Sequence, residues 1–326
     1  MGRSTVSEGT RRVARVPDDL AGMRIDRVLA QLFPEFSRAR LQQWLRDGQV
    51  RLDRLPPRSA REKVRGGEEV ELSAVNEPDE RWRPEAMPLD VVYEDESLIV
   101  INKPAGMVVH PAAGNRDGTL LNALLHHDPA LAAVPRAGIV HRLDKDTSGL
   151  LVVARTLSAQ HILAAQIQAR TISRVYQAVV VGVMTGGGEV DAPIGRHPTL
   201  RTRMAIVARG RRAVSHYRVL ERFRAHTHIS VRLDTGRTHQ IRVHMAHLRH
   251  PIVGDPVYGG RLRIPPACSP ALNATLRGFR RQALHAWRLA VAHPTRGELM
   301  EWSADLPQDM RQLLTALRED AATATA

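Results

Sequence analysis

The segment from Gly138 to Ala154 constrains the fold most, because it combines two strand-forming runs with a densely charged turn. Its apolar runs, Ile139-Val140 and residues 150–153, are typical of buried β-strands. The polar stretch between them holds two carboxylates, two cations and an imidazole within six residues. Rigid elements that carry charged loops are where catalytic groups are usually found. The segment therefore predicts a β-hairpin with a candidate active site at its turn.

An ordinary solvated turn with local ion pairs is the alternative interpretation of this segment. Arg142 and Asp144 are two positions apart, so an extended backbone directs both side chains to one face. Because the flanking runs are expected to be buried, that face is expected to open into a cleft. Spacing alone does not decide between Asp144 and Asp146 as the reactive carboxylate.

The run H-R-L-D-K-D-T-S-G-L at 141–150 resembles the signature of the RluA-type RNA pseudouridine synthases, which carries their catalytic aspartate. Two further runs resemble motifs of the same family, K-P-A-G-M-V-V-H-P at 103–111 and D-T-G-R-T-H-Q-I-R-V-H-M at 234–245. The resemblance covers the chain from about Val13 to Met310. It implies an α+β fold, in which helices flank a mixed, largely antiparallel curved sheet with the active site in its central cleft.

The resemblance also implies roles for individual residues. Asp144 is the expected catalytic aspartate, and Arg237, which follows the glycine of the third motif, is expected to pair with it. Tyr176 stands at the position of the family's active-site tyrosine, where it would stack on the base or take the C5 proton. The residues expected to bind substrate are Arg142, which would hold the place of the flipped nucleotide, together with His141 and Ile241.

The isomerisation of uridine to pseudouridine breaks the C1′–N1 bond and forms a C1′–C5 bond, without electrons, phosphate or energy input. It needs an ionised carboxylate close to the sugar. Burial raises the pKa of a carboxyl group, so a neighbouring guanidinium is needed to keep it charged at neutral pH. Whether the carboxylate attacks C1′ or the base stays open at this point.

The charge balance favours a polyanionic partner. Lys and Arg total 47 against 34 Asp and Glu, a formal net charge of +13. Nine basic residues face three acidic ones between 37 and 65, and nine arginines face Glu221 alone between 196 and 224. Guanidinium groups bind phosphates in a fork geometry with salt-dependent affinity, so both clusters predict RNA contacts, although a solvated charged face is the alternative. The RNA-binding candidates in the first cluster are Arg38, Arg40, Lys63 and Arg65.

The region from Ser37 to Glu68 resembles the S4-type RNA-binding module, which is named after a ribosomal protein. It has Asp53-Arg54 where that module commonly has an Asn-Gly turn, and such turns favour glycine because they need positive φ. Residues 73–88 contain three prolines and few apolar side chains, as a linker does. We expect a disordered tail at 1–12, the module at 13–75, a linker at 76–88, the catalytic domain at 89–317 and a tail at 318–326.

Other features limit the class of protein. The single Cys268 excludes an internal disulfide and a cysteine-rich zinc site, and it fits a reducing cytoplasm. His239 and His244 are five positions apart, unlike the i, i+4 ligands of a helical zinc site. The chain lacks both a run of about 18 apolar residues and the apolar core of a secretory signal. We expect a cytoplasmic monomer with no metal, no cofactor and no membrane partner.

Within the family, the chain is most similar to the branch that modifies large-subunit ribosomal RNA in a hairpin at the subunit interface, helix 69. This similarity implies ribosomal RNA or the pre-ribosomal large subunit as the partner, and it leaves the target uridines open. Two other functions remain as alternatives. One is a non-catalytic RNA-binding or ribosome-assembly protein, and the other is a carboxylate-dependent glycosidase, which would need a second catalytic acid instead of an arginine partner.

Overall fold

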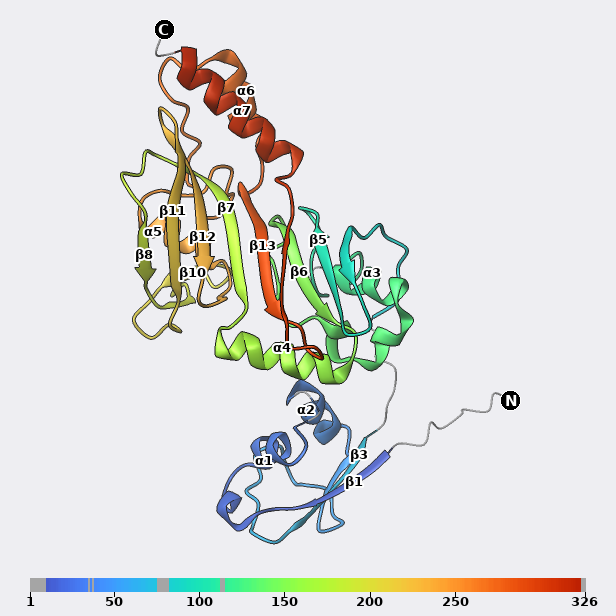
Figure 1. Ribbon diagram of the computed structural model, residues 1–326. Coiled ribbons are helices and arrows are strands. Elements are labelled where there is room, and N and C mark those ends of the chain that lie inside the picture. Colours follow the sequence, from blue (N-terminus) through green and yellow to red (C-terminus); the bar gives the residue numbers. More distant parts are fainter. Residues whose placement is uncertain (1–9, 35, 37, 75–81, 112–114, 324–326) are drawn as a thin grey trace, which may run out of the picture. The chain divides into compact units, whose positions relative to one another are not determined.

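The computed structural model describes residues 10–34, 36, 38–74, 82–111 and 115–323. The chain divides into two compact units, Met1–Glu80 and Arg81–Ala326 (Figure 1). Each unit has a hydrophobic core of its own. None of the described helices has the length and apolar character needed to span a bilayer.

The N-terminal unit packs two helices against a three-stranded antiparallel sheet with the strand order β1-β3-β2. Its elements are β1 (Thr10–Arg15), a 3-10 turn (Asp18–Leu20), α1 (Ile25–Leu32), α2 (Arg38–Arg46), β2 (Val50–Leu52) and β3 (Glu69–Ala74). The predicted tail at 1–12 is wrong for its last three residues, because β1 begins at Thr10, which pairs with Ala74. The rest of that tail lies outside the described residues.

The turn after β2 reaches the primed geometry without glycine. Asp53 and Arg54 have φ of 47° and 67°. The amides of Leu52 and Leu55 each donate to the other residue's carbonyl, at 2.7 and 3.0 Å. The Asp53 carboxylate also accepts a 2.9 Å hydrogen bond from the amide of Glu69, at the start of β3. These bonds offset the cost of holding two L-residues in the left-handed region.

The larger unit is built on one nine-stranded sheet, in which only the contact between β6 and β13 is parallel. The strand order is β4-β5-β6-β13-β7-β12-β11-β8, and β14 pairs with β13. The strands are β4 (Val91–Glu94), β5 (Leu98–Lys103), β6 (Ser148–Ala154), β7 (Ser173–Val181), β8 (Gly188–Asp191), β11 (Val214–Arg222), β12 (His226–Leu233), β13 (Leu284–Ala292) and β14 (Leu299–Ser303). The expected mixed, largely antiparallel sheet is confirmed.

Among the described residues, five α-helices and a small separate hairpin complete this unit. They are α3 (Leu120–His127), α4 (Leu157–Ala169), α5 (Gln240–His247), α6 (Pro270–Gly278), α7 (Gln308–Thr323) and the hairpin of β9 (Ile194–Arg196) and β10 (Met204–Ile206). Short 3-10 turns at Pro129–Ala133 and Pro135–Gly138 lead from α3 towards the segment before β6.

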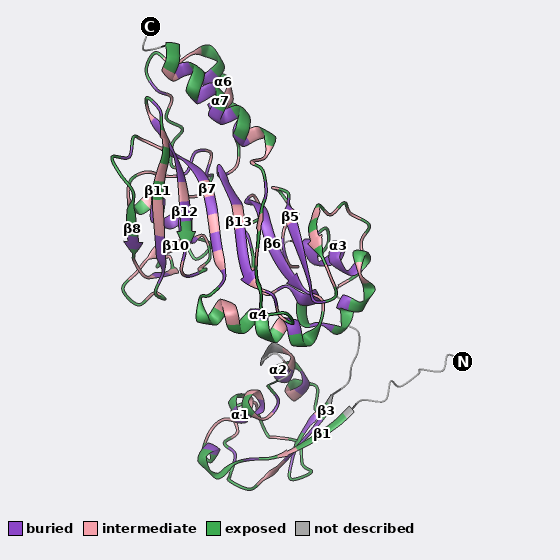
Figure 2. Ribbon diagram, viewed as in Figure 1, coloured by how far each residue is buried: buried purple, intermediate pink, exposed green. Residues whose placement is uncertain are grey.

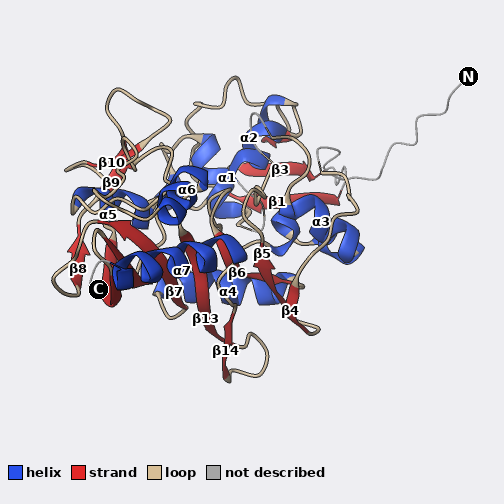
Figure 3. Ribbon diagram, turned by 90° about the horizontal axis from the view of Figure 1, so that it is seen from above, coloured by secondary structure: helices blue, strands red, loops and turns tan. Residues whose placement is uncertain are grey.

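Strand β6 shows why the sheet needs helices on both faces. All seven of its residues are buried (Figure 2). Leu151 and Val153 join the core that contains the leucines of α3, whereas Leu150 and Val152 join the core that contains Leu163 of α4. Successive side chains of a strand point to opposite faces, so a continuous apolar run fits a strand covered on both sides. Seen from above, α3 and α5 lie on one side of the sheet and α4 on the other (Figure 3).

Two predicted boundaries of the catalytic domain differ in the structure. Residues 82–88 were expected in the linker, but Trp82 packs against the main core and Glu85 accepts hydrogen bonds from the amide of Gly118. The expected tail at 318–326 begins inside α7, which runs to Thr323. Asp320 is buried there and accepts a 3.0 Å hydrogen bond from Arg224. Both segments are attached to the catalytic domain by hydrogen bonds of polar side chains. Such long-range bonds cannot be recognised from composition.

Candidate active site

The expected hairpin around Asp144 is reduced to a strand preceded by a loop. Ile139 forms only an isolated bridge with Val153, and residues 140–147 form no strand. The loop turns back on itself where the amide of Thr147 donates to the carbonyl of Asp144, at 3.1 Å. The Asp144 side chain is 16% exposed, so the loop presents a carboxylate that is largely shielded from bulk water but still accessible.

Close packing of the sheet places this loop next to β7. Gly149 of β6 pairs with Ala286 of β13, and Ala286 pairs in turn with Tyr176 of β7. Gly149 has φ of 112°, and a Cβ atom there would lie 2.3 Å from the carbonyl oxygen of Ala286. Glycine is therefore required where β6 meets β13. This close approach places the start of β6, which follows the Asp144 loop, one strand away from Tyr176.

The partner of Asp144 is Arg242, which lies in the first turn of α5. Its Nη1 donates to Oδ2 of Asp144 at 3.0 Å. The same guanidinium donates from Nε and Nη2 to both oxygens of Asp255, at 2.7 and 2.9 Å. Burial disfavours the Arg242 cation, but its bonds to Asp255 and the charges of Asp255 and Asp144 raise its pKa above the ordinary value. Arg242 is thus a permanent, fixed cation between two carboxylates.

The prediction that Arg237 pairs with Asp144 is wrong in this structure. The Arg237 Nε donates to the carbonyl of Arg212 at 3.1 Å, and its amide donates to the side chain of Gln240. Burial and the charges of Arg211 and Arg170 lower the pKa of Arg237, so it lies among cations. The cause is local: α5 begins only at Gln240, so Arg237 precedes the helix whereas Arg242 is part of it.

Tyr176 lies inside the sheet with 6% of its surface exposed. Burial raises the pKa of its phenol, and the charge of Asp144 adds to this while that of Arg174 opposes it. The phenol is therefore neutral at ordinary pH. Its hydroxyl has no hydrogen-bond partner among the described residues.

The three expected substrate-binding residues have different environments. Arg142 is exposed on the loop. His141 accepts a 3.1 Å hydrogen bond at Nε2 from the amide of Val152, and burial together with the charge of Arg174 lowers its pKa to about 3. Ile241 is 4% exposed and belongs to the main core. Arg142 thus lies at the surface, whereas His141 bonds to the backbone of β6 and Ile241 packs in the core.

Lys103, which the sequence analysis did not assign to the site, supports the loop from within. Its side chain is fully buried, and Nζ donates to the carbonyls of Pro104, Met107 and Lys145 at 2.7, 2.9 and 3.0 Å. Burial lowers the pKa of Lys103 to about 7, against the opposing charges of Asp146 and Asp144. Lys145 follows Asp144, so this buried amine fixes the backbone next to the Asp144 carboxylate.

Sequence reasoning also missed Asp255 and Tyr258. Asp255 is buried, and besides Arg242 its carboxylate accepts the amides of Val257 and Tyr258, at 2.8 and 2.9 Å. The Tyr258 hydroxyl contacts His239, at the start of α5. The run D-P-V-Y at 255–258 has the turn-forming proline of a polar loop, but only the folded chain shows that it meets α5.

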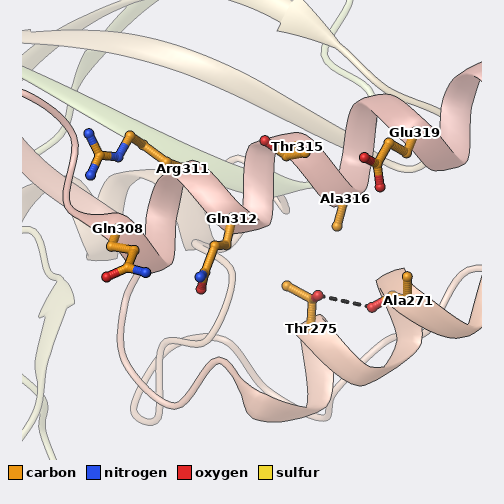
Figure 4. Close-up of a pocket in the computed structure, with 8 residues that line it drawn as sticks. All are labelled: Ala271, Thr275, Gln308, Arg311, Gln312, Thr315, Ala316 and Glu319. Carbon is orange, nitrogen blue, oxygen red and sulfur yellow. Dashed lines mark hydrogen bonds between the residues drawn. The ribbon is translucent and has the colours of Figure 1, made fainter.

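Two cavities lie apart from Asp144. One of about 350 Å³ is lined by β10, by α5 and by Tyr258. Another of about 420 Å³ lies between α6 and α7 and is lined mainly by polar side chains (Figure 4). Across the described residues, no group of three or more His, Cys, Asp or Glu side chains is placed to hold a metal ion.

Of the four basic candidates of the N-terminal unit, the structure describes the side chains of three. Lys63 and Arg65 are exposed, and the guanidinium of Arg40 lies 5.1 Å from the centre of the Trp44 ring. The side chain of Arg38 lies outside the described residues. In the larger unit, Arg201 and Arg203 are exposed on the loop that joins β9 to β10.

A comparison with protein families matches residues 97–247 to a family described as RNA pseudouridylate synthase. It also matches residues 23–70 to the S4 domain. The first match contains Asp144, Tyr176 and Arg242, and the second covers most of the N-terminal unit.

Relatives extend this similarity to almost the whole chain. The protein named ribosomal large subunit pseudouridine synthase D of Pseudomonas aeruginosa is 58% identical over 315 residues, which cover 97% of this chain and 98% of that protein. The protein of the same name from Escherichia coli (strain K12) is 55% identical over 307 residues, 94% of each chain. Among solved structures, human RNA pseudouridylate synthase domain containing 4 is 28% identical, with a TM-score of 0.53 over 70% of this chain and 92% of that chain.

Proposed function

Since the chain belongs to the RNA pseudouridylate synthase family, we propose that it converts uridines of large-subunit ribosomal RNA into pseudouridines. The substrate follows from relatives that are named for the large ribosomal subunit and match both units of the chain. We expect the target to lie in the hairpin at the subunit interface, helix 69. The protein would act in the cytoplasm as a monomer, on ribosomal RNA or on the pre-ribosomal large subunit.

One observation carries the proposal: the buried Arg242 holds Asp144 in the loop that precedes strand β6. Arg242 bonds to Oδ2 and leaves Oδ1 without a hydrogen bond from any described residue. Asp255 fixes Arg242 on its other side, so the guanidinium is held next to the Asp144 carboxylate as a neighbouring positive charge. The free oxygen Oδ1 is the group that would meet the nucleotide.

The remaining residues serve the isomerisation around this oxygen. The C1′–N1 bond breaks, the uracil turns, a C1′–C5 bond forms, the C5 proton leaves and N1 gains a proton. Removing the uridine from its stack costs a few kcal/mol, which is about what RNA contacts can supply. Arg142 is exposed beside Asp144 and would occupy the vacated place. A neutral Tyr176 phenol favours stacking on the uracil over taking the C5 proton.

The decisive test replaces Asp144 by asparagine, with Asp146→Asn as the matched control. Asp144→Asn keeps the shape of the side chain but removes its charge, so we expect pseudouridine formation to fall by at least about 10³-fold. Affinity for large-subunit ribosomal RNA should change little, because the RNA contacts lie elsewhere. Turnover is measured as tritium release from C5 of labelled uridine, and affinity by filter binding.

Asp146→Asn removes the neighbouring carboxylate and should retain activity within about threefold. If Asp144→Asn still forms pseudouridine, the reactive carboxylate is misassigned. If the unaltered chain binds this RNA but forms no pseudouridine, the alternative of a non-catalytic RNA-binding or ribosome-assembly protein is favoured.

A further inference from the structure

His239 lies between the reactive carboxylate and a tyrosine from another loop. Its Nδ1 is 2.8 Å from the Tyr258 hydroxyl, and its Nε2 is 3.9 Å from Oδ1 of Asp144. The two rings meet edge to face, with centres 5.6 Å apart and an angle of 73°. The imidazole therefore faces the oxygen of Asp144 that Arg242 leaves free.

His239 has an unusual backbone conformation, which helps to orient its side chain. His239 precedes the first residue of α5 and has φ of 57°, in the left-handed region. Residues other than glycine adopt this conformation at a cost of about 1–2 kcal/mol, and such strain is concentrated at functional sites. Here Gln240 fixes the conformation, because its side chain bonds to Thr235, to Ser215 and to the amide of Arg237.

The hydrogen bonds favour one tautomer of His239, the one in which Nδ1 accepts and Nε2 carries the proton. The Tyr258 oxygen already accepts a 2.9 Å hydrogen bond from the amide of Met204, so its own proton is free to go to Nδ1 of His239. Burial raises the pKa of Tyr258 and lowers that of His239, so the phenol is protonated and the imidazole is neutral. With Nδ1 as the acceptor, the single N–H of the ring lies on Nε2 and points to Asp144.

We infer that His239, oriented by Tyr258, is a positioning residue that holds the reactive Oδ1 of Asp144 in place for attack. This role rests on the proposed function and deepens it. Arg242 restrains one oxygen of the carboxylate, and the Nε2–H of His239, 3.9 Å away, is placed to restrain the other when the site closes around RNA. With both oxygens restrained, the carboxylate cannot rotate freely and one lone pair of Oδ1 stays directed at the nucleotide.

The separation of 3.9 Å is longer than a hydrogen bond, so the contact forms fully only when RNA fills the site. It acts on the chemical step and not on the capture of RNA, since neither His239 nor Tyr258 belongs to the exposed basic clusters. The same chain of bonds reaches Met204 in β10, directly after the exposed arginines 201 and 203. RNA held by that hairpin is thus connected to the carboxylate through Tyr258 and His239.

The test compares two amide side chains of different reach. His239→Asn tolerates the left-handed backbone but is too short to meet Asp144, whereas His239→Gln can place an N–H near the position of Nε2. We expect His239→Asn to lower kcat roughly 10- to 100-fold with KM within about twofold, and His239→Gln to recover most of this loss. Tyr258→Phe, which frees the imidazole, should lower kcat by a smaller factor, roughly 3- to 10-fold.

The assay uses tritium release from uridine-labelled large-subunit ribosomal RNA, and thermal unfolding is followed in parallel. His247→Ala and Tyr217→Phe are the controls, and both should keep kcat, because neither residue contacts Asp144. The inference is overturned if His239→Asn keeps kcat within threefold, if its loss appears in KM, or if His239→Gln is no better than His239→Asn. Inactivity of the unaltered chain would instead overturn the proposed function itself.

Discussion

The surroundings of Asp144 and the surface of the N-terminal unit use charge in opposite ways. Around Asp144, the Arg242 side chain is 5% exposed, that of Asp255 is fully buried, and both are paired. In the N-terminal unit, Lys63 and Arg65 are exposed. A buried charge is tolerated only with partners in fixed geometry, whereas an exposed charge is screened by salt and attracts phosphates over a distance. Chemistry and RNA affinity should therefore respond to different substitutions.

The largest effect is expected from Arg242→Ala, which leaves the buried Asp255 carboxylate without its only cationic partner among the described residues. Removing one member of a buried ion pair typically costs about 3–5 kcal/mol of unfolding free energy. Turnover should fall as well, because Asp144 loses the guanidinium that holds its Oδ2. Urea unfolding and tritium release measure the two effects.

Arg237→Ala is the matched control for Arg242→Ala, since it removes a guanidinium from the same motif that bonds only to a carbonyl. It should cost about 1 kcal/mol or less and leave the chemical step intact. Equal losses in the two variants would contradict the contrast between a paired, buried arginine and one that lies among cations.

The second effect concerns Lys103, whose amine holds three carbonyls beneath the Asp144 loop. Lys103→Met keeps the apolar stem but leaves these acceptors unpaired, so we expect a loss of about 2–4 kcal/mol of unfolding free energy and slower turnover. Lys145→Met, which changes an exposed lysine of the same loop, is the control and should cost far less.

The pH dependence of stability offers a second measurement on Lys103. Its pKa is lowered from 10.5 to about 7 in the folded chain, so between these values the unfolded chain binds more protons. Stability contributed by this group then rises as pH increases from about 7 towards 10. Lys103→Met should remove this rise, and an unchanged slope would contradict the lowered pKa.

The sequence predicted the type of sheet and the segment that carries the site, but not the contacts within the site. The apolar run at 150–153 indicates a strand buried on both faces, and β6 is such a strand. The choice between Arg237 and Arg242 depends on where α5 begins, which His239 sets through a left-handed backbone. That conformation depends on the bonds that the Gln240 side chain makes to Thr235 and Ser215 and on the contact of His239 with Tyr258, so no local pattern could predict it.

The same limit explains the segments that composition assigned to the linker and the tail. Both are polar, and polarity predicts irregular structure only when the polar groups face water. Glu85 bonds instead to the amide of Gly118, and Asp320 bonds to Arg224 across the domain. These pairs join residues that are 33 and 96 positions apart, beyond the reach of any short-range pattern.

The smallest effect on chemistry, and the clearest on affinity, is expected from removing residues 1–80. The larger unit keeps its own core and the contacts of Asp144, so the rate of the chemical step at saturating RNA should stay within about threefold. Affinity at about 0.1 M salt should fall roughly tenfold or more, and each lost phosphate contact should reduce the slope of log affinity against log salt by about 0.9.

The full-length variant Lys63→Ala/Arg65→Ala tests the same idea without deletion, and it should reduce the slope by up to about 1.8. Arg277→Ala removes an exposed cation outside both basic clusters and should leave the slope unchanged. An unaltered slope after truncation would mean that the N-terminal unit makes no phosphate contacts. The arginines of the larger unit would then account for RNA binding. A lower rate of the chemical step at saturating RNA would mean that the exposed and the buried charges act together. RNA bound by the exposed cations would then be needed to complete the contacts around Asp144.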